Sequence, residues 1–153
     1  MAVGQIWHQR FMGLCNQIAQ WSEDPHFQVG CLIVGEGHVI LATGYNGFPR
    51  GISGRDQSRF DRESGTKFLW FEHAERNALY NAARIGVPVA GATLYVNRFP
   101  CADCSRAIIQ SGLAALVCPP IPAIDGALDA SFRAGKTMLE EAGLSVTLMP
   151  HGD

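Results

Sequence analysis

Positive charge is in short supply in this sequence. Its 12 lysines and arginines are outnumbered by 14 aspartates and glutamates, which gives a formal net charge of -2 at pH 7. A chain without an overall positive field has no general means of holding a long phosphate polymer. We therefore expect no long nucleic acid as a partner, whereas a single nucleotide or nucleobase needs only one or two local cations.

Long apolar runs are also missing. No stretch approaches the roughly 18 apolar residues of a membrane-spanning helix. The first ten residues, MAVGQIWHQR, lack the apolar core of a secretory signal. The sequence thus predicts a cytoplasmic protein that makes no membrane contact.

Cysteine occurs five times, an odd number that does not suit a framework of disulfides. Cys101 and Cys104 form a Cys-x-x-Cys pair, whereas Cys15, Cys31 and Cys118 are scattered among apolar neighbours. This distribution favours metal binding by the pair and reduced core thiols elsewhere.

The composition predicts one globular domain over residues 1–153, since 47% of the residues are hydrophobic and only 17% are charged. Apolar periodicity predicts helices at 5–21, 73–84, 101–111 and 131–142, and strands at 29–34, 38–43, 92–96, 113–118 and 144–149. The first two strands form a hairpin, and strands and helices alternate afterwards. This order predicts an α/β fold with a mixed sheet of about five strands and helices on both faces.

Residues 44–67 form a long segment without a sustained period, and such segments in compact domains are more often functional than idle. The segment contains five cations that could bind a 5′-phosphate. They are Arg50, Arg55, Arg59, Arg62 and Lys67, of which Arg50 is the first choice.

Two short motifs carry the strongest chemical signal. His73-Ala74-Glu75 opens one predicted helix, and Pro100-Cys101-Ala102-Asp103-Cys104 opens the next. Two helix N-termini can converge beyond the edge of a sheet, and their dipoles favour the thiolates that zinc requires. One imidazole and two thiolates leave a fourth tetrahedral position open, as in catalytic zinc sites.

Glu75 follows His73 by two residues, so it can stand beside the metal without binding it. Bound zinc brings the pKa of water toward about 7, and a neighbouring carboxylate can move the proton. Each motif alone has an ordinary explanation, such as a redox Cys-x-x-Cys pair or a surface histidine. Together and in this order they are the signature of zinc deaminases.

The chain resembles the deoxycytidylate (dCMP) deaminase branch of the cytidine deaminase superfamily from about residue 24 to residue 117. The zinc motif is shared by the whole superfamily, and GYNGFPRG at 44–51 is typical of the dCMP branch. Other matching segments are DP at 24–25, VG at 29–30, HAERNA at 73–78 and IIQSG at 108–112. The resemblance implies a three-layer α/β/α cytidine deaminase-like fold.

The same resemblance implies roles for individual residues. His73, Cys101 and Cys104 would hold Zn²⁺, and Glu75 would protonate N3 and the departing amine while water adds to C4 of cytosine. The Asn46 side chain and the Ala74 backbone N–H would contact the substrate. Aromatic residues that could pack on its ring are Phe48, Trp70, Phe71 and Phe99, and Phe99 stands next to the metal motif. The branch is commonly oligomeric, so a homo-oligomer is expected.

Two alternatives stay open at this point. The residues after Cys118, Pro119-Pro120-Ile121-Pro122, lack the Tyr-bearing polar segment of many dCMP deaminases, so the substrate could instead be a nucleoside, a free base or a related amino-heterocycle. A non-catalytic module stabilised by zinc is a third reading. The presence of Glu75 argues against it, because a structural site has no use for a proton carrier.

Overall fold

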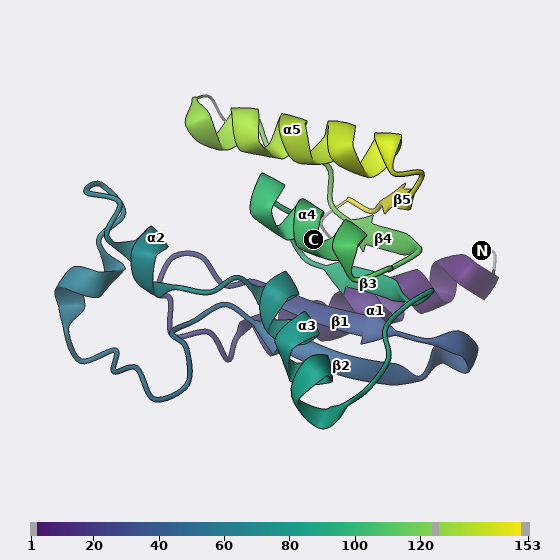
Figure 1. Ribbon diagram of the computed structural model, residues 1–153, viewed down its shortest axis with the longest axis horizontal. Coiled ribbons are helices and arrows are strands. Elements are labelled where there is room, and N and C mark those ends of the chain that lie inside the picture. The colour runs from purple at the N-terminus through teal and green to yellow at the C-terminus, as the bar shows by residue number, and fades with distance from the viewer. Residues whose placement is uncertain (1–2, 124–125, 151–153) are drawn as a thin grey trace.

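The computed structural model describes residues 3–123 and 126–150, and its elements follow the predicted order (Figure 1). The helices and strands are α1 (Val3–Ala19), β1 (Gly30–Val34), β2 (Ile40–Tyr45), α2 (Lys67–Trp70), α3 (Ala74–Ile85), β3 (Thr93–Val96), α4 (Ala102–Gln110), β4 (Ala115–Cys118), α5 (Ala127–Glu141) and β5 (Ser145–Leu148). Short 3-10 turns occupy Glu36–His38 and Gln57–Phe60. Among the described helices, none is long and apolar enough to cross a membrane.

The five strands form one mixed sheet in the order β2-β1-β3-β4-β5. Strand β1 is antiparallel to both of its neighbours, whereas β3, β4 and β5 are mutually parallel. The carboxyl ends of β2 and β3 therefore lie at the same edge, on either side of the start of β1. The segments that follow β2 and β3 leave the sheet from this edge, and this is where the predicted site residues are found.

Helices cover both faces of the sheet, which confirms the predicted α/β fold (Figure 1). Side chains of β1 alternate between the faces: Leu32 and Val34 pack with α1, whereas Cys31 and Ile33 pack in the cluster that includes residues of α3, α4 and α5. Because both faces are covered, β1 is apolar along its whole length, as its sequence indicated.

Most boundaries differ from the predictions by one or two residues, the start of α5 differs by four, and the four-residue helix α2 was not predicted. Helix α1 ends at Ala19, so Trp21 lies beyond it; 62% of Trp21 is exposed, and it packs edge-on against Tyr45 instead of joining the core. Helix α5 begins at Ala127, four residues before the predicted start, because Gly126 with φ of 90° supplies the break and Ser131 lies inside the helix. None of these differences moves the metal-binding motifs.

The long segment after β2 is fastened to the domain by a buried ion pair between Lys67 and Asp24. Asp24 also accepts hydrogen bonds from the backbone N–H groups of His26 and Phe27, at 2.9 and 3.0 Å. Lys67 therefore has a carboxylate partner within the protein, and the prediction that it could bind a phosphate is not supported by this position.

We expect Asp24→Asn to destabilise the protein by about 3 kcal/mol at pH 7, because the Lys67 charge would remain buried without its partner. Burial raises the pKa of Asp24, but the hydrogen bonds from Lys67 and the two amides outweigh it and leave the pKa below its usual value. Stability from this carboxylate is thus present above its unfolded pKa of about 3.9 and lost as the pH falls through the lower folded value. Urea unfolding should show the difference between the wild type and Asp24→Asn shrinking below about pH 4; a constant difference down to pH 2 would contradict the assignment.

Candidate metal centre

The three predicted metal ligands sit at the starts of two neighbouring helices. His73 is the residue that caps the N-terminus of α3, Cys101 caps α4, and Cys104 lies in the first turn of α4. Neither cap residue uses its side chain to close its own helix, so the imidazole and the thiol are available to a ligand. Helix N-termini carry partial positive charge, which favours thiolates there.

The spacing of the ligand atoms fits one zinc ion. The Nδ1 atom of His73 lies 3.5 Å from Sγ of Cys101 and 3.4 Å from Sγ of Cys104, and the three ligand atoms all lie within 4.8 Å of one another. Tetrahedral zinc with ordinary Zn–N and Zn–S bonds would place such N and S atoms about 3.6 Å apart. The three side chains therefore meet in space as predicted.

The groups around Cys101 favour the thiolate form of its side chain. The hydrogen bond with Cys104 and the contacts with His73 lower the pKa of Cys101 to about 4, against the opposing effect of burial. The hydrogen bond with Cys101 in turn raises the pKa of His73. The lowered pKa favours the thiolate form of Cys101, which is the form that zinc binds. The pKa of Cys104 is instead raised, by its hydrogen bond with Cys101 and by burial, so zinc binding has to release a proton from Cys104.

Glu75 is the second residue of α3, and only 4% of it is exposed. Its Oε2 atom lies 3.6 Å from Sγ of Cys104. Burial raises the pKa of its carboxyl above the ordinary value. A carboxyl group that lies next to the ligands, and whose pKa is shifted toward neutrality, is suited to exchanging protons with whatever the metal binds.

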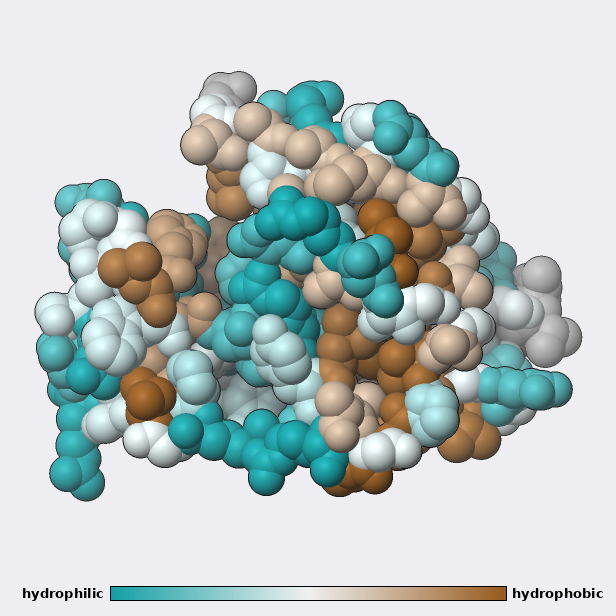
Figure 2. Space-filling view, in the orientation of Figure 1, coloured by the Kyte–Doolittle hydropathy of each residue, from teal (hydrophilic) through white to brown (hydrophobic). Residues whose placement is uncertain are grey.

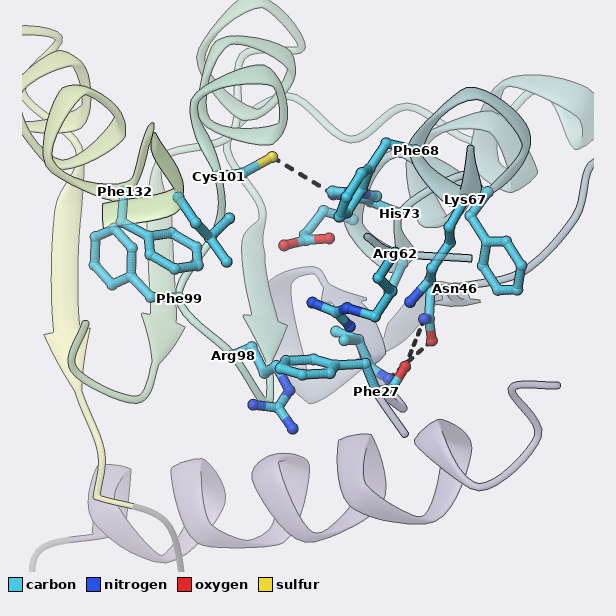
Figure 3. Close-up of a pocket in the computed structure, with 15 residues that line it drawn as sticks. Phe27, Asn46, Arg62, Lys67, Phe68, His73, Arg98, Phe99, Cys101 and Phe132 are labelled. Carbon is cyan, nitrogen blue, oxygen red and sulfur yellow. Dashed lines mark hydrogen bonds between the residues drawn. The ribbon is translucent and has the colours of Figure 1, made fainter. Parts of the chain in front are cut away.

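A pocket of about 110 Å³ opens beside the ligands. This volume is smaller than the several hundred Å³ of a typical ligand pocket, so it suits the ring of a ligand whose substituents extend to the mouth of the hollow. Figure 2 shows the surface hollowed between the α2 segment and helices α4 and α5, and Figure 3 shows the residues that line the pocket. Of the predicted site residues, the lining includes His73, Ala74, Glu75, Cys101, Asn46 and Phe99.

Asn46 and Ala74 present polar groups to this pocket. Asn46 is buried, its Oδ1 accepts from the Val29 N–H at 2.9 Å, and its Nδ2 donates to the Phe27 carbonyl at 2.7 Å. These bonds fix the amide while leaving it a second N–H and a second lone pair. Ala74 is the first residue of α3, and its backbone N–H has no acceptor within that helix.

The predicted aromatic residues divide into two groups. Phe71 and Phe99 are buried and line the pocket. Phe48 instead packs against Phe60 and Phe71, with ring centroids 5.1 and 4.5 Å apart. Trp70 lies under the guanidinium of Arg59 at 3.9 Å. Only the first two are therefore placed to contact a bound ring.

Arg50 lies outside this pocket. It is exposed, its guanidinium donates to Oδ1 of Asn81 on α3 at 2.6 Å, and it belongs to a separate hollow that also includes Tyr45 and Tyr80. The chain after β2 passes Asn46 at the sheet edge and then turns to the outer side of α3. A residue only four positions from Asn46 is thereby carried away from the metal ligands, so this placement does not favour Arg50 as a substrate contact.

Several pocket residues were not singled out from the sequence. They are Phe27, Val29, Phe68, Arg98, Leu128 and Phe132. Arg98 and Val29 had a usable signal, since one directly precedes Phe99 and the other opens the first matching strand. Phe68, Leu128 and Phe132 come from α2 and α5, and no local pattern indicates that these helices flank the motifs.

Comparison with known proteins agrees with this geometry. The cytidine and deoxycytidylate deaminase zinc-binding region matches residues 5–119. A probable deoxycytidylate deaminase of Caenorhabditis elegans is 37% identical over 139 residues, which are 90% of this chain and 66% of that protein. An uncharacterized deaminase encoded in the luxG 3′ region of Aliivibrio fischeri is 32% identical over 145 residues, 94% of either chain.

A solved structure resembles the fold closely. The dCMP deaminase of cyanophage S-TIM5, in complex with dCMP and dUMP, superposes with a TM-score of 0.75 at 25% identity, covering 97% of this chain and 99% of that one. The chain spans just under two thirds of the C. elegans relative. The match over most of the sequence, the shared fold and the clustered His73, Cys101 and Cys104 lead to one conclusion. This chain belongs to the cytidine and deoxycytidylate deaminase family and carries that family's zinc site.

Proposed function

We propose that the protein is a hydrolytic deaminase that converts a cytosine-type nucleotide, with dCMP as the first choice, into its uracil form and releases ammonia. The observation that carries this proposal is the Glu75 carboxyl, buried beside the three zinc ligands in one small pocket. A structural zinc site would need neither the pocket nor the carboxyl.

The pocket residues divide the chemistry among them. His73, Cys101 and Cys104 would hold Zn²⁺, which when bound would lower the pKa of a water molecule in the pocket. Glu75 would take one proton from water and give it to N3 as the new C4–O bond forms. It then carries the remaining hydroxyl proton to the exocyclic amine, and the C4–N bond breaks to give uracil and ammonia. The raised pKa of Glu75 suits a group that must both accept and donate.

Other residues orient the ring and exclude water. Ala74 lines the pocket at the start of α3, and its backbone N–H, which has no acceptor within that helix, would donate to the ring carbonyl. Asn46, fixed by its two backbone hydrogen bonds, would contact the sugar or base with its remaining N–H. Phe71 and Phe99 form buried apolar walls that keep bulk water from the reacting carbon.

The relatives support a nucleotide substrate. The C. elegans protein is described as a probable deoxycytidylate deaminase, and the cyanophage enzyme of the same fold was solved with dCMP and dUMP.

We also propose that the protein forms a homo-oligomer. This proposal is supported by large apolar side chains on the surface, among them Trp21, Tyr45, Tyr80 and Ile85, each at least 42% exposed.

The substrate can be tested directly. Ammonia release should be measured with dCMP, CMP, deoxycytidine, cytosine and purine analogues at equal concentration. We expect kcat/KM for dCMP to exceed that for deoxycytidine at least about tenfold, since a bound phosphate adds charge-assisted hydrogen bonds. Equal values for the two would assign the enzyme to nucleosides, and turnover of a purine alone would replace the cytosine assignment.

One observation favours the alternative that the substrate is a nucleoside or a free base. The segment after β4, which starts with Pro119-Pro120, offers no tyrosine or cation near the pocket. If a phosphate is bound, it must be bound by residues from elsewhere in the chain.

A further inference from the structure

Two arginines lie on opposite faces of the Phe27 ring at the pocket. The guanidinium carbon of Arg62 is 4.2 Å from the ring centroid, and that of Arg98 is 4.3 Å from it. Figure 3 shows the ring between the two side chains. Arg62 comes from the segment before α2, Arg98 follows β3, and Phe27 precedes β1, so three separate parts of the chain form this arrangement.

Neither arginine forms an ion pair with an acidic residue in the part of the chain that the structure describes. Among the described residues, every ion pair involves other cations, and Lys67, which lines the same pocket, is neutralised by Asp24. The Nε atom of Arg98 is buried and has no hydrogen-bond acceptor. Burial, together with the nearby charge of Arg62, lowers the pKa of Arg98. Two half-buried like charges without a counter-ion cost free energy, which an anion in the pocket would offset.

The position of the pair matches the geometry of a nucleotide. Arg62, Arg98 and Phe27 line the same pocket as Glu75 and the zinc ligands His73 and Cys101. A nucleotide whose base lies at the metal site can therefore reach the two guanidinium groups with its sugar-phosphate end, because all of these residues line one pocket. The Phe27 ring fills the space directly between the two guanidinium groups. A phosphate would therefore lie at the edge of the ring, where the two groups can donate to different oxygens of it.

We propose that Arg62 and Arg98, held apart by the Phe27 ring, bind the 5′-phosphate of the substrate and make the enzyme select a nucleoside monophosphate over the nucleoside. This inference rests on the proposed function. It supplies the cations that the segment after β4 lacks, and it replaces Arg50, which the structure places in another hollow. Two positive charges match the charge of about -2 on a monophosphate at neutral pH.

Binding of the reaction product tests the pair without turnover. Calorimetric titration with dUMP and with deoxyuridine should be compared for the wild type, Arg62→Gln and Arg98→Gln. We expect each variant to bind dUMP about tenfold or more weakly, with deoxyuridine binding changed less than about threefold. Arg84→Gln, which alters an exposed arginine at the far end of α3, should bind both ligands like the wild type.

Inorganic phosphate provides a probe that does not depend on the base. In the NMR spectrum, the Nε–H resonance of Arg98 can be identified because it is lost in Arg98→Gln. This resonance should shift when phosphate or dUMP is added, and it should not shift when deoxyuridine is added. No shift with either anion would overturn the inference, as would equal loss of dUMP and deoxyuridine binding in both variants. If the shift occurs but no cytosine compound is deaminated, the proposed function fails while the anion site stands.

Discussion

Glu75→Gln is expected to lower kcat at least about a hundredfold while the protein keeps one zinc per chain, because the amide cannot accept and return a proton. The change is isosteric and removes a buried ionisable group, so it should not weaken folding. Ammonia release under saturating dCMP gives kcat. On the same preparation, metal analysis gives the zinc content and a thermal unfolding curve gives the stability.

Glu63→Gln is the matched control for this variant. Glu63 is exposed in the segment between β2 and α2, and its side chain lies outside the pocket. We expect wild-type turnover from it. Turnover within threefold of the wild type in Glu75→Gln would remove the carboxyl from the mechanism, and a loss of zinc in that variant would assign Glu75 to the metal instead.

The metal site could be predicted because its information is local. His73 and Glu75 are two residues apart, Cys101 and Cys104 are three apart, and each pair begins a helix whose apolar pattern is plain in the sequence. The only part of this prediction that concerned residues far apart in the sequence was that the starts of α3 and α4 lie close together. In the structure, β2 and β3 end at the same edge of the sheet, and the bridge between Gly47 and Glu72 returns the chain to that edge just before α3.

The walls of the pocket could not be predicted in the same way. Phe27, Phe68 and Phe132 come from a loop, a four-residue helix and the last helix, and each is an ordinary apolar residue in its own neighbourhood. Arg50 shows the opposite situation. Its place in a recognisable motif favoured it, whereas a turn of the backbone directs its side chain to Asn81.

Cys101→Ala is expected to abolish stable zinc binding and to reduce deamination at least as severely as Glu75→Gln, because two protein ligands are too few for a tight site. Cys15→Ala is the matched control: Cys15 is fully buried, but it lies in the core between α1 and the opposite face of the sheet. We expect it to lose some stability and to keep one zinc per chain. Equal zinc content in Cys101→Ala and the wild type would contradict the ligand assignment.

Zinc-edge X-ray absorption of the wild-type protein measures the ligand atoms themselves. For the wild type, the structure predicts two sulfur neighbours at about 2.3 Å and lighter neighbours at about 2.0 to 2.1 Å, which include His73 and a water molecule. A spectrum with four sulfur neighbours, or with no sulfur at all, would show that His73, Cys101 and Cys104 do not share an ion.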